Sequence, residues 1–180
     1  MKETGDQNKP PVVGIVMGSD SDWRVMEKVT SVLDQLNIPF HVTIASAHRS
    51  PERTADYARS ARARGLRVII AGAGAAAHLA GSIAALTTLP VIGVPLDSSS
   101  LKGLDALLAT VQMPAGVPVA TMAIGAAGAK NASILAAQIL ATSDPEIEGK
   151  LEQLRKEMAG QVAQKAESLR EIVNRKTIHE

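Results

Sequence analysis

Apolar runs and helical stretches alternate along most of the chain. The predicted strands are Val12–Met17, His41–Ala45, Arg67–Ala71, Pro90–Leu96 and Pro118–Ile124. The predicted helices are Asp22–Leu36, Pro51–Arg64, Ala75–Leu86, Leu101–Val111 and Ala127–Ala141. Such alternation is typical of a parallel sheet that helices cover on both faces. The pattern therefore predicts an α/β fold: a three-layer sandwich around a five-stranded parallel sheet, flavodoxin-like or Rossmann-like.

Two helices have clear boundary signals. Ser50 and Pro51 open the second helix and Gly65 stands just past its end. Ser143-Asp144-Pro145 opens a last helix, predicted over 144–175, in the same way. Its apolar residues form one stripe: Ile147, Leu151, Leu154, Met158, Val162, Leu169 and Val173. One stripe indicates packing by one face, on its own core or on a neighbouring subunit. We interpret the chain as a single domain, with a polar tail (1–11), a flavodoxin-like core (12–141) and this terminal helix.

The composition limits the classes of protein that fit. A length of 180 residues suits one domain with a real core, and a formal net charge of +1 does not indicate a nucleic-acid or membrane partner. The absence of cysteine excludes disulfides and thiol chemistry and fits a reducing compartment. The sequence shows neither a signal peptide nor an apolar run that could span a membrane. We therefore expect a cytoplasmic protein.

Charged residues are unevenly distributed. Between Arg67 and Ser143 only five residues are charged, whereas fifteen are charged from Asp144 onward. A segment so poor in charge cannot easily form the wetted surface of a monomer. Either the rest of the chain wraps it or subunits bury it between them, and we favour subunits.

Polar residues follow the first predicted strand, where ligands bind in parallel sheets. Gly18 permits a tight turn, and Ser19 and Ser21 offer hydroxyl and backbone donors to an anion at a helix start. Asp22 suits ribose hydroxyls better than a phosphate. A plain capped turn would use the same residues.

The loop after the second strand combines a histidine with an arginine. Arg49, beside a helix start, has the charge and the planar donors of a phosphate clamp. His48 can give and take a proton near neutral pH. The alternative is a surface histidine and arginine in an ordinary turn.

The loop after the third strand, Ala71 to His78, is nearly free of side chains. Its glycines let the backbone approach a flat ligand closely. The loop also fits the dinucleotide pattern G-x-G-x-x-A over Gly72–Ala77, with Asp97 as the ribose-binding acid. That pattern normally opens the first unit of a sheet, and a dehydrogenase needs a substrate domain for which this chain has no room. His78 is interpreted as a ligand contact or as a helix-start histidine.

Other chemical templates fail. Gly125–Lys130 has the wrong glycine spacing for a phosphate-binding Walker loop, and no G-x-S-x-G elbow is present. No histidine or carboxylate cluster has metal-ligand spacing. We expect chemistry without ATP, metal, cofactor or covalent nucleophile.

Five motifs in order give a specific resemblance over Val12 to Leu140. They are Met17-Gly18-Ser19-x-Ser21-Asp22-Trp23, Ser46-Ala47-His48-Arg49, Ala71–Gly74 with Ala76–Leu79, Pro90–Pro95 and Val111–Pro114. Together they resemble the class I phosphoribosylaminoimidazole carboxylases, the 5-(carboxyamino)imidazole ribonucleotide mutases of purine biosynthesis. The resemblance implies a flavodoxin-like fold, a homo-octamer with active sites where subunits meet, and no cofactor.

The resemblance also implies roles for individual residues. Ser21, Ser46 and Arg49 would hold the phosphate, Asp22 the ribose, and Gly74 with its neighbours the imidazole. His48 would be the general acid and base. The implied substrate-binding set is Gly18, Ser19, Ser21, Asp22, Ser46, Ala47, Arg49, Ala73, Gly74, Ala76, His78 and Leu79.

Departures from the family pattern are small. Members usually have Gly where Ala75 stands, Pro where Ala80 stands and Met where Ser82 stands, and we expect these changes to affect packing rather than activity. Related carboxylases that use carbon dioxide directly tend to carry Lys where Arg49 stands, which favours the mutase. A direct carboxylase and a nucleotide-binding module without catalysis remain the alternatives.

Overall fold

The computed structural model describes residues 10–177 of the chain, with side chains to Val173. Its strands form one parallel sheet in the order β2-β1-β3-β4-β5. The strands are β1 (Val13–Met17), β2 (Phe40–Ile44), β3 (Val68–Gly74), β4 (Val91–Leu96) and β5 (Ala120–Thr121). This order is the flavodoxin-like one, so the predicted α/β three-layer sandwich is confirmed.

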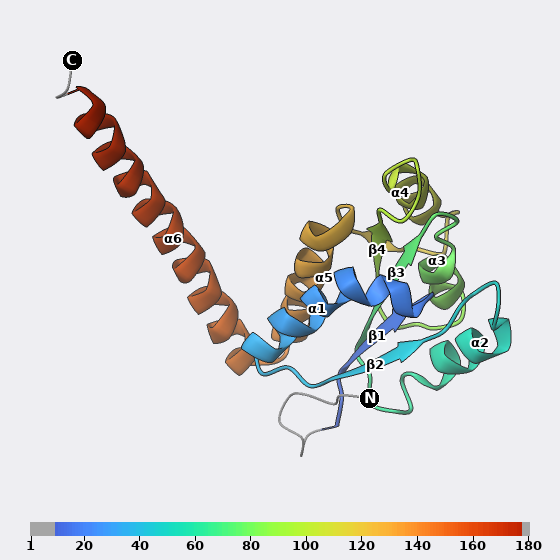
Figure 1. The fold of residues 1–180 in the computed structure, drawn as a ribbon. Coiled ribbons are helices and arrows are strands. Elements are labelled where there is room, and N and C mark those ends of the chain that lie inside the picture. The colour runs from blue at the N-terminus through green and yellow to red at the C-terminus, as the bar shows by residue number, and fades with distance from the viewer. Residues whose placement is uncertain (1–9, 178–180) are drawn as a thin grey trace.

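Helices cover both faces of the sheet (Figure 1). They are the 3-10 turn η1 (Asp20–Asp22), α1 (Trp23–Gln35), α2 (Pro51–Ser60), α3 (Leu79–Ala84), α4 (Leu104–Val111), α5 (Gly125–Ala141) and α6 (Pro145–Thr177). Helices α1 and α5 pack together in the core on one face, and α2 and α3 pack in the core on the other. The central strands β1 and β4 are buried throughout, which explains why they appear in the sequence as continuous apolar runs.

The third loop differs from its predicted structure. Strand β3 continues to Gly74 rather than ending at Ala71, and α3 begins at Leu79 rather than Ala75. Ala75 has a φ of 49°, in the left-handed region, so the chain turns there instead of starting a helix. Helix α4 likewise begins at Leu104 rather than Leu101, because Lys102 and Gly103 have positive φ values of 51° and 86°.

Two other predicted elements are too long. The fifth strand pairs with β4 only over Ala120–Thr121, not over Pro118–Ile124. It is an edge strand with a single neighbour, and Pro118 has no N–H to donate to a ladder. Helix α2 ends at Ser60 rather than Arg64, and the chain reverses through a turn to Gly65, whose φ is 87°. Gly65 thus supplies the left-handed turn that its position after the helix indicated.

Helix α6 packs on the body by its first turns only. Ile147 and Leu151 are buried in the core with α5, and Leu154 packs partly against it. Beyond them the helix projects away from the domain as a single rod (Figure 1). Met158, Val162 and Leu169 on the same stripe are 43%, 68% and 61% exposed. The terminal helix therefore covers the charge-poor middle of its own chain only where its first turns pack on α5. In the part of the chain that the structure describes, no helix is both long and apolar enough to cross a membrane.

Candidate active site

Strand register brings three loops together. Met17, the last residue of β1, pairs with Ile44 of β2 on one side and with Gly72 of β3 on the other. The residues that follow these strands therefore emerge side by side at the carboxyl edge of the sheet. Strand order reverses here, since β2 and β3 flank β1, and ligands of such sheets bind at this point.

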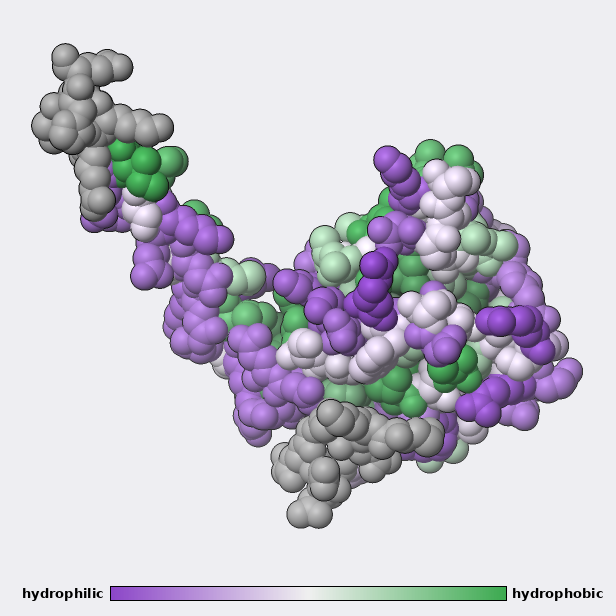
Figure 2. Space-filling view, in the orientation of Figure 1, coloured by the Kyte–Doolittle hydropathy of each residue, from purple (hydrophilic) through white to green (hydrophobic). Residues whose placement is uncertain are grey.

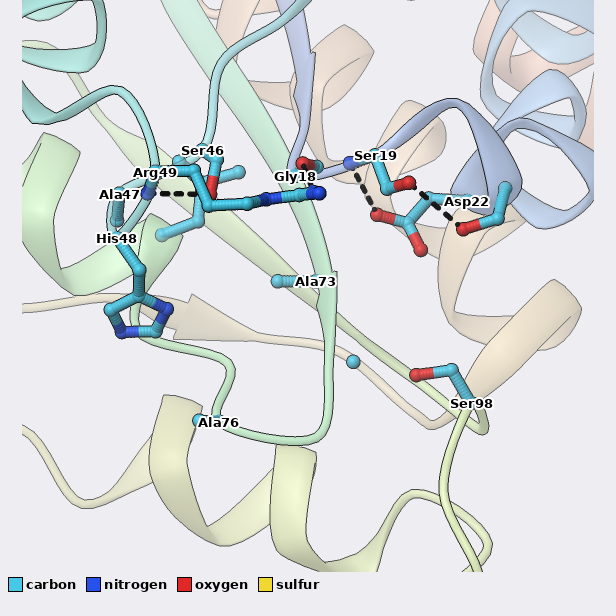
Figure 3. A pocket seen from close by; sticks show the side chains of 13 residues that line it. Gly18, Ser19, Asp22, Ser46, Ala47, His48, Arg49, Ala73, Ala76 and Ser98 are labelled. Carbon is cyan, nitrogen blue, oxygen red and sulfur yellow. Dashed lines mark hydrogen bonds between the residues drawn. The ribbon is translucent and has the colours of Figure 1, made fainter.

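A pocket of about 340 Å³ opens between these loops (Figure 3). A volume in this range suits a small ligand. Its lining residues come from the ends of β1 to β4: Gly18, Ser19, Ser21, Asp22, Ser46, Ala47, His48, Arg49, Ala73, Gly74, Ala76, Leu79 and Ser98. Every predicted site residue except His78 lies in this lining. Ser98 is the one lining residue that the sequence analysis did not predict.

The loop after β1 is organised around two carboxylates. The buried Asp22 accepts the backbone N–H of Ser19 on Oδ2 at 3.0 Å. Burial raises the pKa of the Asp22 carboxyl, and the backbone hydrogen bonds of Ser19 and Gly18 and the charge of Arg49 oppose this rise. Asp20 accepts the Ser19 hydroxyl and the Ser21 N–H, both at 3.0 Å, and these bonds lower its pKa. The Ser21 hydroxyl donates to Ser19 Oγ at 3.1 Å.

The loop after β2 is held by Ser50. The Ser50 hydroxyl accepts the Ser46 N–H at 3.0 Å and donates to the Ser46 carbonyl at 3.1 Å. Ser50 stands at the helix cap, as predicted, but its side chain fixes the loop instead of capping α2. The Ser46 hydroxyl in turn accepts the Arg49 N–H at 3.2 Å.

Arg49 joins the first two loops. Its guanidinium extends across the pocket (Figure 3) and donates from Nη2 to the Gly18 carbonyl at 3.0 Å. The side chain remains exposed, so its other donors can reach a ligand in the pocket. The arrangement places a fixed positive charge beside the serines of the β1 loop, as an anion site requires.

His48 and His78 form a direct pair. Nε2 of His48 lies 2.9 Å from Nδ1 of His78, and the two rings meet edge to face at 5.0 Å between centroids. One nitrogen of this pair donates the shared proton and the other accepts it. His78 stands at the start of α3, but its side chain does not cap that helix. It does not line the pocket itself, but it contacts the lining residue His48.

The end of β3 and the loop into α3 form an apolar wall of the pocket, with Ala73, Gly74, Ala76 and Leu79. The dinucleotide pattern does not take up its usual geometry here. Gly72 and Gly74 both lie within β3, and the helix starts only at Leu79, beyond the whole pattern. Asp97, its proposed ribose acid, does not line the pocket.

Ser98 was not predicted as a site residue, because Asp97 was the only residue after β4 that matched a known binding pattern. The rule that ligands bind beyond strand ends would have included it, since β4 ends at Leu96. Over residues 10–173, whose side chains the structure describes, no group of three or more His, Asp or Glu residues could hold a metal ion.

Known proteins resemble this chain in sequence and in structure. The sequence model described as AIR carboxylase matches residues 12–161, further than the motif resemblance reached. The N5-carboxyaminoimidazole ribonucleotide mutase of Pyrococcus horikoshii is 54% identical over 92% of this chain and 93% of its own length. The mutase of Bacillus subtilis is also 54% identical, over 88% of this chain and 98% of its own. The crystal structure of Treponema denticola PurE superposes with a TM-score of 0.77 at 29% identity, covering 86% of this chain and 95% of that one. The chain belongs to the AIR carboxylase family.

Proposed function

We propose that this protein is an N5-carboxyaminoimidazole ribonucleotide mutase of purine biosynthesis. It converts 5-(carboxyamino)imidazole ribonucleotide into 4-carboxy-5-aminoimidazole ribonucleotide. The observation that carries the proposal is the division of the pocket. Loops that carry Arg49 and serines lie on one side, an apolar wall of mostly small residues lies on the other, and His48 lies between them. Curated relatives that share more than half of the residues bear the name of this activity.

The two sides of the pocket suit the two ends of the substrate. Arg49, with the hydroxyls of Ser21 and Ser46, binds the phosphate, and Asp22 accepts hydrogen bonds from the ribose. The backbone of Ala73–Ala76 stacks against the imidazole ring, because no side chain beyond a methyl group separates it from the ligand. Gly18, Ser19, Ala47 and Leu79 complete the enclosure.

The reaction needs one proton carrier. The bond between the exocyclic nitrogen and the carboxyl carbon breaks, carbon dioxide is released, and the nitrogen takes a proton from His48. Ring carbon 4 then gives an electron pair to carbon dioxide, and its own proton passes to His48. One proton has moved from carbon to nitrogen, so the histidine ends in the state in which it began. Carbon dioxide must stay in the pocket between the two steps.

His78 acts through His48 rather than on the substrate. The 2.9 Å bond fixes the orientation of the His48 ring before substrate arrives.

We further propose that the protein assembles as a homo-octamer in the cytoplasm. Large apolar side chains are exposed on α4 and its preceding turn (Leu101, Leu104, Leu108 and Val111) and on α6. Side chains of this size at an exposure near one half are typical of surfaces that a partner covers. The α4 surface lies inside the charge-poor segment between Arg67 and Ser143, which the sequence analysis expects subunits to bury. A phosphorylated intermediate is retained inside the cell, which is the reason for placing the reaction there.

The histidine tests the proposed chemistry. We expect His48→Asn to reduce turnover of 5-(carboxyamino)imidazole ribonucleotide by at least 10²- to 10⁴-fold, the usual contribution of a general acid–base group. Calorimetry of the same variant with 4-carboxy-5-aminoimidazole ribonucleotide is expected to show binding close to wild type. His41→Asn, which changes a histidine beside Tyr57 outside the pocket, is the control. Activity of His48→Asn within about threefold of wild type would remove His48 from this role. If the wild-type protein binds the nucleotide but does not convert it, the alternative of a nucleotide-binding module without catalysis would hold.

A further inference from the structure

Gly74 is a glycine for a reason other than its backbone. Glycine is favoured where φ is positive, and Gly74 does not have a positive φ. A Cβ built on Gly74 would overlap Ser98 Oγ and would lie 2.8 Å from Ser98 Cβ. The missing side chain of Gly74 therefore makes room for the side chain of Ser98.

Register explains why these two residues meet. Gly74 at the end of β3 pairs with Leu96 at the end of β4, and Ser98 follows two residues later. Ser98 lines the pocket on the side opposite His48, and its hydroxyl points inward (Figure 3). Residues in the β3 and β4 loops are thus arranged to bring one hydroxyl to the wall where the ring is proposed to bind.

The hydroxyl of Ser98 is available for a ligand. No hydrogen bond joins it to another described residue, whereas the hydroxyl of its neighbour Ser99 accepts the Leu101 N–H at 3.1 Å. The other described lining residues on this wall, Ala73, Gly74, Ala76 and Leu79, have no polar side chain. The heterocycle of 4-carboxy-5-aminoimidazole ribonucleotide carries ring nitrogen atoms, an exocyclic amine and a carboxylate. Each of these polar groups loses bound water when the nucleotide enters the pocket.

From this geometry we infer that Ser98 is a specificity-determining residue, whose hydroxyl hydrogen-bonds the polar edge of the substrate's heterocycle. The inference rests on the proposed function, which supplies the heterocycle. It assigns the phosphate end to Arg49 and the serines of the first two loops, and the ring end to Ser98. A side chain that recognises only the ring leaves binding of the sugar phosphate unchanged.

Two ligands separate these ends: 4-carboxy-5-aminoimidazole ribonucleotide, and ribose 5-phosphate, which lacks the ring. For Ser98→Ala we expect calorimetry to show about five- to thirty-fold weaker binding of the nucleotide, the effect of one unpaired polar group. Binding of ribose 5-phosphate is expected to stay within twofold of wild type. Ser100→Ala is the matched control, because Ser100 lies in the same loop but does not line the pocket.

The possible results distinguish the role of Ser98 from the proposed mutase activity. Equal nucleotide binding by wild type and Ser98→Ala, with turnover intact, overturns the role of Ser98 and leaves the mutase standing. Equal weakening of both ligands also overturns it, because Ser98 would then shape the pocket as a whole. A wild type that does not bind the nucleotide overturns both proposals.

Packing gives an independent check. Gly74→Ala is expected to lower the melting temperature, and the second change Ser98→Gly is expected to restore most of the loss, because it removes both overlapping atoms. An equal loss in the two backgrounds would show that Gly74 is needed for some reason other than Ser98.

Discussion

At the scale of single residues, Ala75 is the clearest case in which sequence and backbone disagree. It holds a φ of 49°, which costs an alanine about 1–2 kcal/mol and a glycine nothing. The resemblance had marked this position as one where family members usually have Gly, and the departure was expected to affect packing. The structure indicates that backbone conformation is the property affected, since Ala75 is exposed.

Ala75→Gly should therefore stabilise the protein. Relief of the left-handed strain outweighs the extra freedom that glycine gives the unfolded chain, about 0.4–1 kcal/mol, so we expect a net gain of up to about 1 kcal/mol. Ala115→Gly is the control, because Ala115 is an exposed loop residue without a positive φ, and it should lose stability. Urea unfolding measures both. An equal loss of unfolding free energy in the two variants would contradict the proposed backbone strain at Ala75.

Asp22 makes stability depend on pH in a direction opposite to that of most carboxylates. Its pKa is raised by burial, so the folded protein holds this proton more tightly than the unfolded chain does. Ionisation of Asp22 therefore destabilises the fold as the pH rises from its ordinary value of 3.8 through the raised one. The charged form is retained because the proposed ribose contact needs an acceptor.

We accordingly expect Asp22→Asn to melt at a higher temperature than wild type at neutral pH and to bind the nucleotide more weakly. The asparagine oxygen can still accept the Ser19 N–H, so the loop is kept. The gain in melting temperature should shrink as the pH falls through the raised pKa of Asp22 towards its ordinary value of 3.8, because wild-type Asp22 becomes protonated. A gain that does not change with pH would assign the effect to something other than this ionisation.

At the scale of elements, the sequence determines the buried parts of the fold better than its edges. Strands β1 and β4 were predicted to within one residue, because both are buried and apolar throughout. The fifth strand and the start of α3 were mispredicted. One depends on pairing at a sheet edge, and the other on an alanine in a conformation that alanines rarely adopt.

The candidate site was largely predictable for the same reason. Its residues follow buried strands, and parallel register places the loop after each strand beside the next. What the sequence could not give were contacts between side chains distant in the chain. The His48–His78 bond spans 30 positions, and the contact of Gly74 with Ser98 depends on the exact end of β3.

The projecting part of α6 offers the prediction at this scale. Its apolar stripe continues beyond the body through Met158, Val162, Leu169 and Val173, and Figure 2 shows apolar side chains along this otherwise hydrophilic rod. If subunits cover the stripe, the paired change Val162→Glu and Leu169→Glu should reduce the mass measured by light scattering. Gln164→Glu, at an exposed residue that the helical period places on the far side of the helix from Val162 and Leu169, should leave the mass unchanged. An identical mass for all three proteins would exclude α6 from the assembly.

At the scale of the whole molecule, assembly and chemistry are connected. In the single chain the pocket opens to solvent, since His48, Arg49 and Ala76 are all exposed. A reaction that releases carbon dioxide and recaptures it needs a closed site. We therefore expect that the assembly which covers the apolar surfaces also closes the pocket. Light scattering at neutral pH should give eight times the chain mass of 18.8 kDa, and a mass near 18.8 kDa would contradict this expectation.

The fate of the carboxyl carbon tests the central claim most directly. The purified protein is given 5-(carboxyamino)imidazole ribonucleotide labelled with carbon-13 in its carboxyl group, in buffer that contains excess unlabelled bicarbonate. A mutase that holds carbon dioxide in its pocket is predicted to return the label in the carboxyl group of 4-carboxy-5-aminoimidazole ribonucleotide, at a rate that bicarbonate does not change. Product that carries unlabelled carbon, formed equally well from aminoimidazole ribonucleotide and bicarbonate, would contradict the account and identify a direct carboxylase.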